Sequence, residues 1–170
     1  MPGYIQIYTG NGKGKTTAAL GLALRAAGAG LRVFIGQFLK TKTCSEHKAL
    51  ERFKDLITVI TFGRPGFVTV PTEEDKLLAE EGWKACAQAI HSGQYSLVIM
   101  DEINVAIHKG LLDLQEVLKV IKARPKDLEV ILTGRYAPSE LVEIADLVTE
   151  MKEKKHYYER GIKAREGFEY

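Results

Sequence analysis

The residues with the clearest chemical potential form a glycine-rich segment near the N-terminus, TGNGKGKTT, from Thr9 to Thr17. Its alternating glycines allow successive backbone N–H groups to turn inward on an anion. Lys15 adds a positive charge, and Thr16 adds a hydroxyl that can ligate a phosphate-bound Mg²⁺. The pattern predicts a variant P-loop, in which Thr9 stands where the first glycine is usual. The predicted nucleotide-binding residues are Gly10, Asn11, Gly12, Lys13, Gly14, Lys15, Thr16 and Thr17.

The segments on either side of this loop decide whether the pattern is meaningful. Residues 4–8 (YIQIY) are typical of a strand, and residues 15–27 are alanine-rich and typical of a helix. A helix that starts here points its positive N-terminal end at the bound anion. The alternative is a surface glycine turn with coincidental lysines, and the strand-loop-helix context argues against it. We expect the helix to be apolar nearly all round and therefore buried.

A second motif supplies acidic groups. The apolar run LVIM at residues 97–100 leads directly into Asp101 and Glu102. Ligands bind at the carboxyl ends of strands in open α/β sheets, and Mg²⁺ is held there by one or two carboxylates. Alone, such a strand end often only caps the next helix. Together with the P-loop it predicts that Thr16, Asp101 and Glu102 support a metal ion and that Lys15, Thr16 and Glu102 are catalytic.

Extended and helical signals alternate along the whole chain, which predicts an α/β fold of the P-loop NTPase (RecA-like) type. We expect a mostly parallel sheet with helices on both faces. We also expect residues 1–170 to form a single domain, with a polar and irregular C-terminal tail at 152–170. The expected strands are 4–8, 32–39, 56–62, 97–100, 128–133 and 147–151, and the expected helices are 15–27, 45–53, 72–91, 112–123 and one that starts at Pro138.

Three local details of these helices are open to test. Ser45 is the expected N-cap of helix 45–53, and Thr72 is the expected cap of the long helix. Trp83 lies off the expected buried face of the long helix, and a Gly- and Pro-rich loop at 63–72 precedes this helix. That buried face should comprise Leu78, Ala85, Cys86, Ala89 and Ile90.

Composition excludes several classes of protein. The 24 basic and 22 acidic residues leave a net charge of only +2, which argues against nucleic acid or an acidic membrane surface as the main partner. No apolar run approaches the ~20 residues of a membrane span, and no signal peptide is recognisable. Cys44 and Cys86 form neither a CxxC pair nor a zinc spacing, so we expect free thiols and a cytoplasmic location.

The histidines add little to this interpretation. The sequence shows no metal-ligand spacing for them, and we expect surface or capping roles for His47, His91 and His108.

Two alternatives to the first interpretation of the P-loop are open. A P-loop kinase or ATPase is the alternative enzyme class, and a kinase needs a group that takes a proton from the acceptor. Asp101, Glu102 or His156 could serve, but no further feature of the sequence supports that role. A nucleotide-gated binding module without turnover is the other possibility, and it would require a large exposed apolar face.

Four segments in this order give the chain a resemblance to a known family. They are GNGKGKTTAA (10–19), VIMDEINVAIHKGLLDLQEVL (98–118), TGRYAPSELVEIADLVTEM (133–151) and KHYYERGIKAREGFEY (155–170). The chain closely resembles the P-loop type of corrinoid adenosyltransferases, which act on cob(I)alamin or cob(I)yrinic acid a,c-diamide. The TGRxAP segment, the Lys-His…Gly-Ile-Lys-Ala tail and the QFLK segment at 37–40 are not shared by P-loop kinases generally.

The resemblance implies a reaction in cobalamin biosynthesis. The 5′-deoxyadenosyl group of ATP is transferred to the cobalt of a reduced corrinoid, and triphosphate leaves. Cobalt(I) is itself a strong nucleophile, so the protein has to supply positioning and charge. The resemblance also implies Mg²⁺ (or Mn²⁺) as cofactor, a γ-phosphate held in the P-loop, an electron-donor protein as a partner and a homodimer.

The resemblance also gives a role to the 63–72 loop. In the family this loop covers the lower face of the corrinoid, and Phe67 matches an aromatic residue there. A tryptophan is common two places later, where this chain has Thr69. Some members have an N-terminal extension that helps to enclose the corrinoid, and we expect this chain to lack it. The alternative for Phe67 is a loop aromatic with only a packing role. The tail at 152–170 is expected to fold over bound nucleotide or corrinoid and to be mobile without them.

Overall fold

Six strands form one parallel sheet in a computed structural model that describes residues 1–41, 44–66 and 68–169. The order across the sheet is β3-β2-β4-β5-β1-β6, and every neighbouring pair is parallel. The α/β class predicted from the alternating signals is therefore confirmed. The strands are β1 (Ile5–Thr9), β2 (Val33–Phe38), β3 (Ile57–Phe62), β4 (Leu97–Asp101), β5 (Glu129–Thr133) and β6 (Leu147–Glu150).

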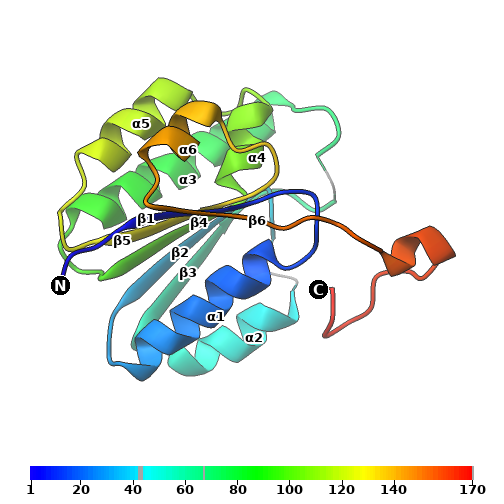
Figure 1. The fold of residues 1–170 in the computed structure, drawn as a ribbon, viewed down its shortest axis with the longest axis horizontal. Coiled ribbons are helices and arrows are strands. Elements are labelled where there is room, and N and C mark those ends of the chain that lie inside the picture. Colours follow the sequence, from blue (N-terminus) through cyan, green and yellow to red (C-terminus); the bar gives the residue numbers. More distant parts are fainter. Residues whose placement is uncertain (42–43, 67, 170) are drawn as a thin grey trace.

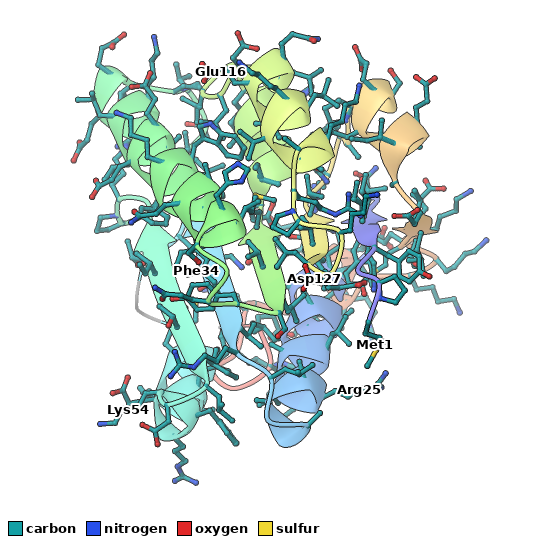
Figure 2. All side chains as sticks on the ribbon, turned by 90° about the vertical axis from the view of Figure 1, so that its left-hand side faces the viewer. Met1, Arg25, Phe34, Lys54, Glu116 and Asp127 are labelled. Atoms are coloured by element: carbon teal, nitrogen blue, oxygen red, sulfur yellow. The ribbon has the colours of Figure 1, made fainter. Side chains whose placement is uncertain are left out.

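Helices cover both faces of the sheet, as the sequence predicted. Helices α3 to α6 lie on one face and α1 and α2 on the other (Figure 1). In Figure 2 the side chains of Glu116 on α5 and Arg25 on α1 accordingly lie on opposite sides of the sheet. The helices are α1 (Lys15–Gly28), α2 (Ser45–Leu50), α3 (Glu73–His91), α4 (Ile103–His108), α5 (Leu114–Lys122) and α6 (Ser139–Ile144), with 3-10 turns η1 (Glu51–Phe53) and η2 (Tyr157–Arg160).

The central strands have apolar side chains on both faces because both faces are covered. On β4, for example, Val98 and Met100 belong to the core under α3 to α6, whereas Leu97 and Ile99 belong to the core under α1 and α2. Burial of these side chains stabilises the sheet. Within the described residues no helix is long and apolar enough to span a membrane.

The prediction that helix α1 is buried all round is wrong. Leu24, on the side away from the sheet, is 45% exposed. The buried apolar residues of α1 are all alanines, and such small side chains let a helix backbone lie close to a sheet. The buried residues of α1 are Lys15, Ala19, Ala23, Ala26 and Ala27.

One prediction about capping is wrong, and one helix was not predicted. Cys44, not Ser45, is the N-cap of α2, and its side chain makes no capping hydrogen bond. Helix α4 was not predicted, because its six residues are too few to show a helical period.

The buried face of α3 also differs from the predicted one. Trp83 is buried, whereas Leu78 and Ala85 are only half-buried. The face toward the sheet is thus rotated toward Ala79, Gly82 and Trp83.

The start of α3 matches the prediction and anchors the preceding loop. Thr72 and Asp75 form a reciprocal capping box. The Asp75 carboxylate also accepts hydrogen bonds from the Arg64 guanidinium at 2.8 and 3.0 Å. The loop at 63–72 is therefore tied to the helix by a bidentate ion pair. The Arg64 hydrogen bonds lower the pKa of Asp75 well below its usual range, against the opposing effect of burial, with further help from Thr72.

This ion pair gives a pH-dependent prediction. Because the pKa of Asp75 is lowered in the folded state, its contribution to stability is complete above the unfolded pKa of about 4 and is lost as the pH falls below it. Asp75→Asn should therefore lower the free energy of unfolding at pH 7, with a smaller difference from wild type at pH 3. Urea titrations at both pH values measure this. Glu74→Gln, at an exposed position of the same first turn, is the control, and an equal deficit of Asp75→Asn at both pH values would contradict the assignment.

Candidate functional site

Neighbouring strands bring polar side chains together where they end. Gln37 on β2 is in register with Asp101 on β4, and Tyr8 on β1 is in register with Thr133 on β5. The P-loop follows β1, so it starts at the same edge of the sheet. Parallel pairing thus places Gln37, Asp101, Thr133 and the P-loop side by side, at the edge where open α/β sheets bind ligands.

The Asp101 carboxylate lies at the centre of this group and is completely buried. Its Oδ1 accepts hydrogen bonds from Thr16 Oγ1 at 2.8 Å and from Thr133 Oγ1 at 2.6 Å. Its Oδ2 accepts hydrogen bonds from Gln37 Nε2 at 3.0 Å and from Lys40 Nζ at 2.7 Å. Each donor comes from a different element or loop, so the carboxylate joins the P-loop helix to the ends of β2, β4 and β5.

The Lys40 ammonium allows this carboxylate to remain ionised. Burial alone would raise the pKa of Asp101, but the charge of Lys40 and the hydrogen bonds from Lys40, Thr133 and Gln37 lower it. Burial alone would lower the pKa of Lys40, but the charge and hydrogen bond of Asp101 raise it. Both groups are therefore charged at neutral pH. A buried pair of this kind is destabilising if either partner is removed.

The P-loop surrounds the Lys15 side chain. Lys15 is only 8% exposed, and its Nζ donates hydrogen bonds to the carbonyl oxygens of Gly10 and Gly12 at 2.8 Å each. Burial lowers the pKa of Lys15. The loop itself rests on the end of β6, because the Gly12 N–H donates to the Met151 carbonyl at 2.7 Å. Gly10 has a φ of +94°, and a Cβ there would lie 2.4 Å from Met151 O, so only glycine fits.

Glu102 stands at the turn between β4 and α4 in the left-handed region, with a φ of +63°. Its N–H donates to Thr133 Oγ1 at 3.0 Å, and the same hydroxyl donates to Asp101. Burial, and then the charge of Asp101, raise the pKa of Glu102. A non-glycine residue in this region of backbone space is strained by about 1–3 kcal/mol, and such strain is common at functional sites.

The oxygen atoms at this edge suit a hard divalent cation. Thr16 Oγ1 and the Glu102 carboxylate are oxygen ligands of the kind that Mg²⁺ prefers, and Mg²⁺ with bound phosphates needs only one or two protein ligands. A cationic side chain already lies here, since Lys40 Nζ is 3.2 Å from Thr16 Oγ1 and 2.7 Å from Asp101 Oδ2. No cluster of three or more His, Cys, Asp or Glu side chains with metal-binding geometry occurs in the described part of the chain.

The structure brings together only part of the predicted site. Asn11 and Thr17 are exposed, so their role in nucleotide binding stays a prediction. Phe67 lies outside the described residues. The predicted residues that do join the group around Asp101 or the P-loop lysine are Gly10, Gly12, Lys15, Thr16, Asp101 and Glu102.

The side chain of Lys13 leaves the phosphate cradle and binds the C-terminal tail. Its Nζ donates to Tyr157 Oη at 2.8 Å, to the Phe168 carbonyl at 2.7 Å and to Glu169 Oε1 at 2.6 Å. Tyr157 and Arg165 also bind Glu169, and the Arg165 guanidinium lies over the rings of Tyr157 and Phe168. The tail is thus irregular apart from the turn η2, but it is folded back onto the P-loop. Figure 1 shows it leaving the sheet after β6 and returning toward the start of α1.

Sequence reasoning gave no role at the site to three of its residues, Gln37, Lys40 and Thr133. Each had a signal, because each is a polar residue at the carboxyl end of a buried strand or directly after it. His47, predicted to be a surface or capping residue, contacts Gln37 Oε1 through its Nε2 beside the site. A strand-by-strand search for polar ends would have found all but His47.

The 63–72 loop borders this edge of the sheet. Lys109, after α4, donates from its Nζ to the Thr69 carbonyl at 3.3 Å. Next to Lys109, His108 stacks on Tyr136 with ring centroids 4.2 Å apart. Tyr136 lies in the loop after β5 and has a φ of +61°. Aromatic and basic side chains therefore line the rim between the loops that follow β4 and β5.

Comparison with known proteins relates the chain to one family. The profile described as ATP:corrinoid adenosyltransferase BtuR/CobO/CobP matches residues 1–170. The chain is 39% identical over 171 residues to the corrinoid adenosyltransferase of Pseudomonas aeruginosa, a match that covers 99% of this chain and 84% of that protein. It is 38% identical to the corrinoid adenosyltransferase of Sinorhizobium sp (99% and 80%) and 35% identical to that of Escherichia coli strain K12 (99% and 86%).

The contacts of Lys13 predict how the tail is held. Lys13→Met should release the tail, because it removes the donor to Tyr157, Phe168 and Glu169. Hydrogen exchange, followed by mass spectrometry, should then become faster for the amides of residues 156–169 and stay unchanged in β4. Lys154→Met, at an exposed lysine of the tail, is the matched control. Equal exchange in wild type and Lys13→Met would show that Lys13 does not hold the tail.

Proposed function

The chain belongs to the ATP:corrinoid adenosyltransferase family BtuR/CobO/CobP, and we propose that the cluster around Asp101 and the P-loop carries out its transfer reaction. The enzyme transfers the 5′-deoxyadenosyl group of ATP to cobalt(I) of a corrinoid. The electron pair of cobalt forms the bond to C5′, the bond from C5′ to oxygen breaks, and triphosphate leaves with its electrons. The main support for the proposal is that Asp101 accepts hydrogen bonds from both Thr16 of the P-loop helix and Lys40, in a chain that matches the family over residues 1–170.

The main task of the protein in this reaction is to stabilise the charge of the leaving triphosphate. We assign this task to the P-loop amides, Lys15 and Thr16, which the sheet holds in fixed positions before the substrate arrives. The buried Lys15 ammonium is suited to it, because a charge in a site of low dielectric acts more strongly than in water. The γ-phosphate is proposed to lie in the loop, so that C5′ faces the corrinoid.

Mg²⁺ (or Mn²⁺) is the proposed cofactor, held by Thr16 and Glu102, with Asp101 behind them. When bound, the ion would neutralise charge on the triphosphate. The Asp101 carboxylate already accepts four hydrogen bonds, so it positions Thr16 and is not available as a direct ligand. Glu102 is the better candidate for a direct ligand.

The remaining partners are also proposals. Cobalt(I) has to be generated by reduction, so we propose an electron-donor protein. Cys44 and Cys86 are free thiols, which supports a reducing, cytoplasmic compartment. A homodimer is proposed as well, supported by the exposed apolar side chains Leu147 and Val148 on the outer strand β6. Sedimentation analysis should then give a mass of about twice 18.9 kDa.

The central experiment combines product analysis with Lys15→Ala. Wild-type protein with ATP and chemically reduced corrinoid should yield adenosylcorrinoid and triphosphate, whereas a kinase or ATPase would yield ADP. Lys15→Ala should lose about a hundredfold or more in kcat/KM, as expected for a preorganised charge contact in the transition state. Its circular dichroism should match wild type.

Lys84→Ala, on the exposed side of α3, is the control for this variant. Near-normal turnover of Lys15→Ala at saturating ATP would refute the assignment. Loss of its fold would show that Lys15 is structural.

Phe67 is proposed to press on the lower face of the corrinoid and to keep the axial ligand of cobalt away. Phe67→Ala should keep much of its rate with prereduced cobalt(I), because the nucleophile no longer depends on ligand removal. With cobalt(II) and a mild reductant the variant should fail, and Thr69→Trp should if anything improve the enzyme. Steady-state rates under both conditions measure the difference, and an equal loss under both would assign Phe67 to general corrinoid binding or loop folding.

A further inference from the structure

Lys40 contacts both Asp101 and the P-loop threonine. It follows β2 directly after Leu39, whose φ of +59° turns the chain back over the edge of the sheet. Its Nζ lies 2.7 Å from Asp101 Oδ2 and 3.2 Å from Thr16 Oγ1. Its side chain is 24% exposed, so it is not fully enclosed by the protein. Lys40 therefore places a full positive charge against the hydroxyl that is proposed to bind the metal.

A lysine and a divalent cation compete for this place. The Thr16 hydroxyl donates its proton to Asp101 Oδ1 and accepts a hydrogen bond from Lys40. A metal ion on the same oxygen would lie within a few ångströms of the ammonium. Even with the screening of bulk water, a unit charge about 4 Å from a divalent ion gives a repulsion worth more than a factor of about ten in affinity.

We propose that Lys40 is a positioning residue that holds the place of the metal in the nucleotide-free protein, so that the metal enters only together with ATP. This inference rests on the proposed function, which places the metal at Thr16 and Glu102. The triphosphate brings negative charge, which attracts the ammonium away from Thr16 and Asp101, and the entering divalent ion then supplies the positive charge near the Asp101 carboxylate. Lys40 has a flexible four-carbon side chain, so this movement requires no change of the backbone.

The test measures binding of Mn²⁺ by electron paramagnetic resonance, first without nucleotide. Wild-type protein should bind Mn²⁺ weakly, and Lys40→Gln should bind it at least about tenfold more tightly, because the amide keeps a donor for Asp101 but has no charge. Lys40→Arg keeps the charge and should behave like wild type. Lys84→Gln, at an exposed position of α3, removes a lysine charge away from the site and should also behave like wild type.

A second arm with ATP separates the inference from the proposed function. Wild type with ATP should give the spectrum of protein-bound Mn²⁺, and Glu102→Gln should weaken it; without that signal, the metal assignment and the inference both fall. If the signal is present but Lys40→Gln binds Mn²⁺ alone no better than wild type, the role of Lys40 is overturned while the metal site stands. Tight binding of Mn²⁺ by the wild-type protein without nucleotide would also overturn the role of Lys40. This measurement uses wild-type protein only, so it does not depend on whether a variant folds.

Discussion

The buried carboxylate of Asp101 is the interaction on which the rest of the site depends. It is shielded from solvent, so it remains charged only because Lys40 compensates it and Thr16, Thr133 and Gln37 donate to it. These donors come from the P-loop helix, β2, β5 and the turn after β2. A single charge thereby fixes the distance between the P-loop and the ends of three strands. Removal of either charge would leave the other buried and unpaired, which is typically costly.

The parallel sheet makes this arrangement possible. Because all six strands run in the same direction, their carboxyl ends lie at one edge and the loops that follow them face the same space. Non-glycine residues with positive φ occur after β2, β4 and β5, at Leu39, Glu102 and Tyr136. The chain turns sharply at each of these points. The same edge therefore combines dense hydrogen bonding with local backbone strain.

The features of this protein that could be predicted from the sequence are those encoded by short, local sequence patterns. The P-loop, the acidic end of β4 and the Thr72 cap depend on residues close together in the chain, and the structure has all three in the expected elements. What it missed depends on contacts between distant residues. Lys40 matters because Asp101 is 61 positions away in sequence and 2.7 Å away in space. The burial of Trp83 similarly depends on how α3 is rotated against the sheet, which a helical period alone does not fix.

The place of β1 in the sheet has a consequence for how the protein is made. The P-loop is encoded near the start of the chain, but β1 lies between β5 and β6, the last two strands to be synthesised. Gly12 of the loop donates to the carbonyl of Met151, and Gly10 packs against the same residue. During translation the loop therefore lacks its contacts with Met151 until β6 has been synthesised. The first functional motif to be synthesised is among the last to acquire its native surroundings.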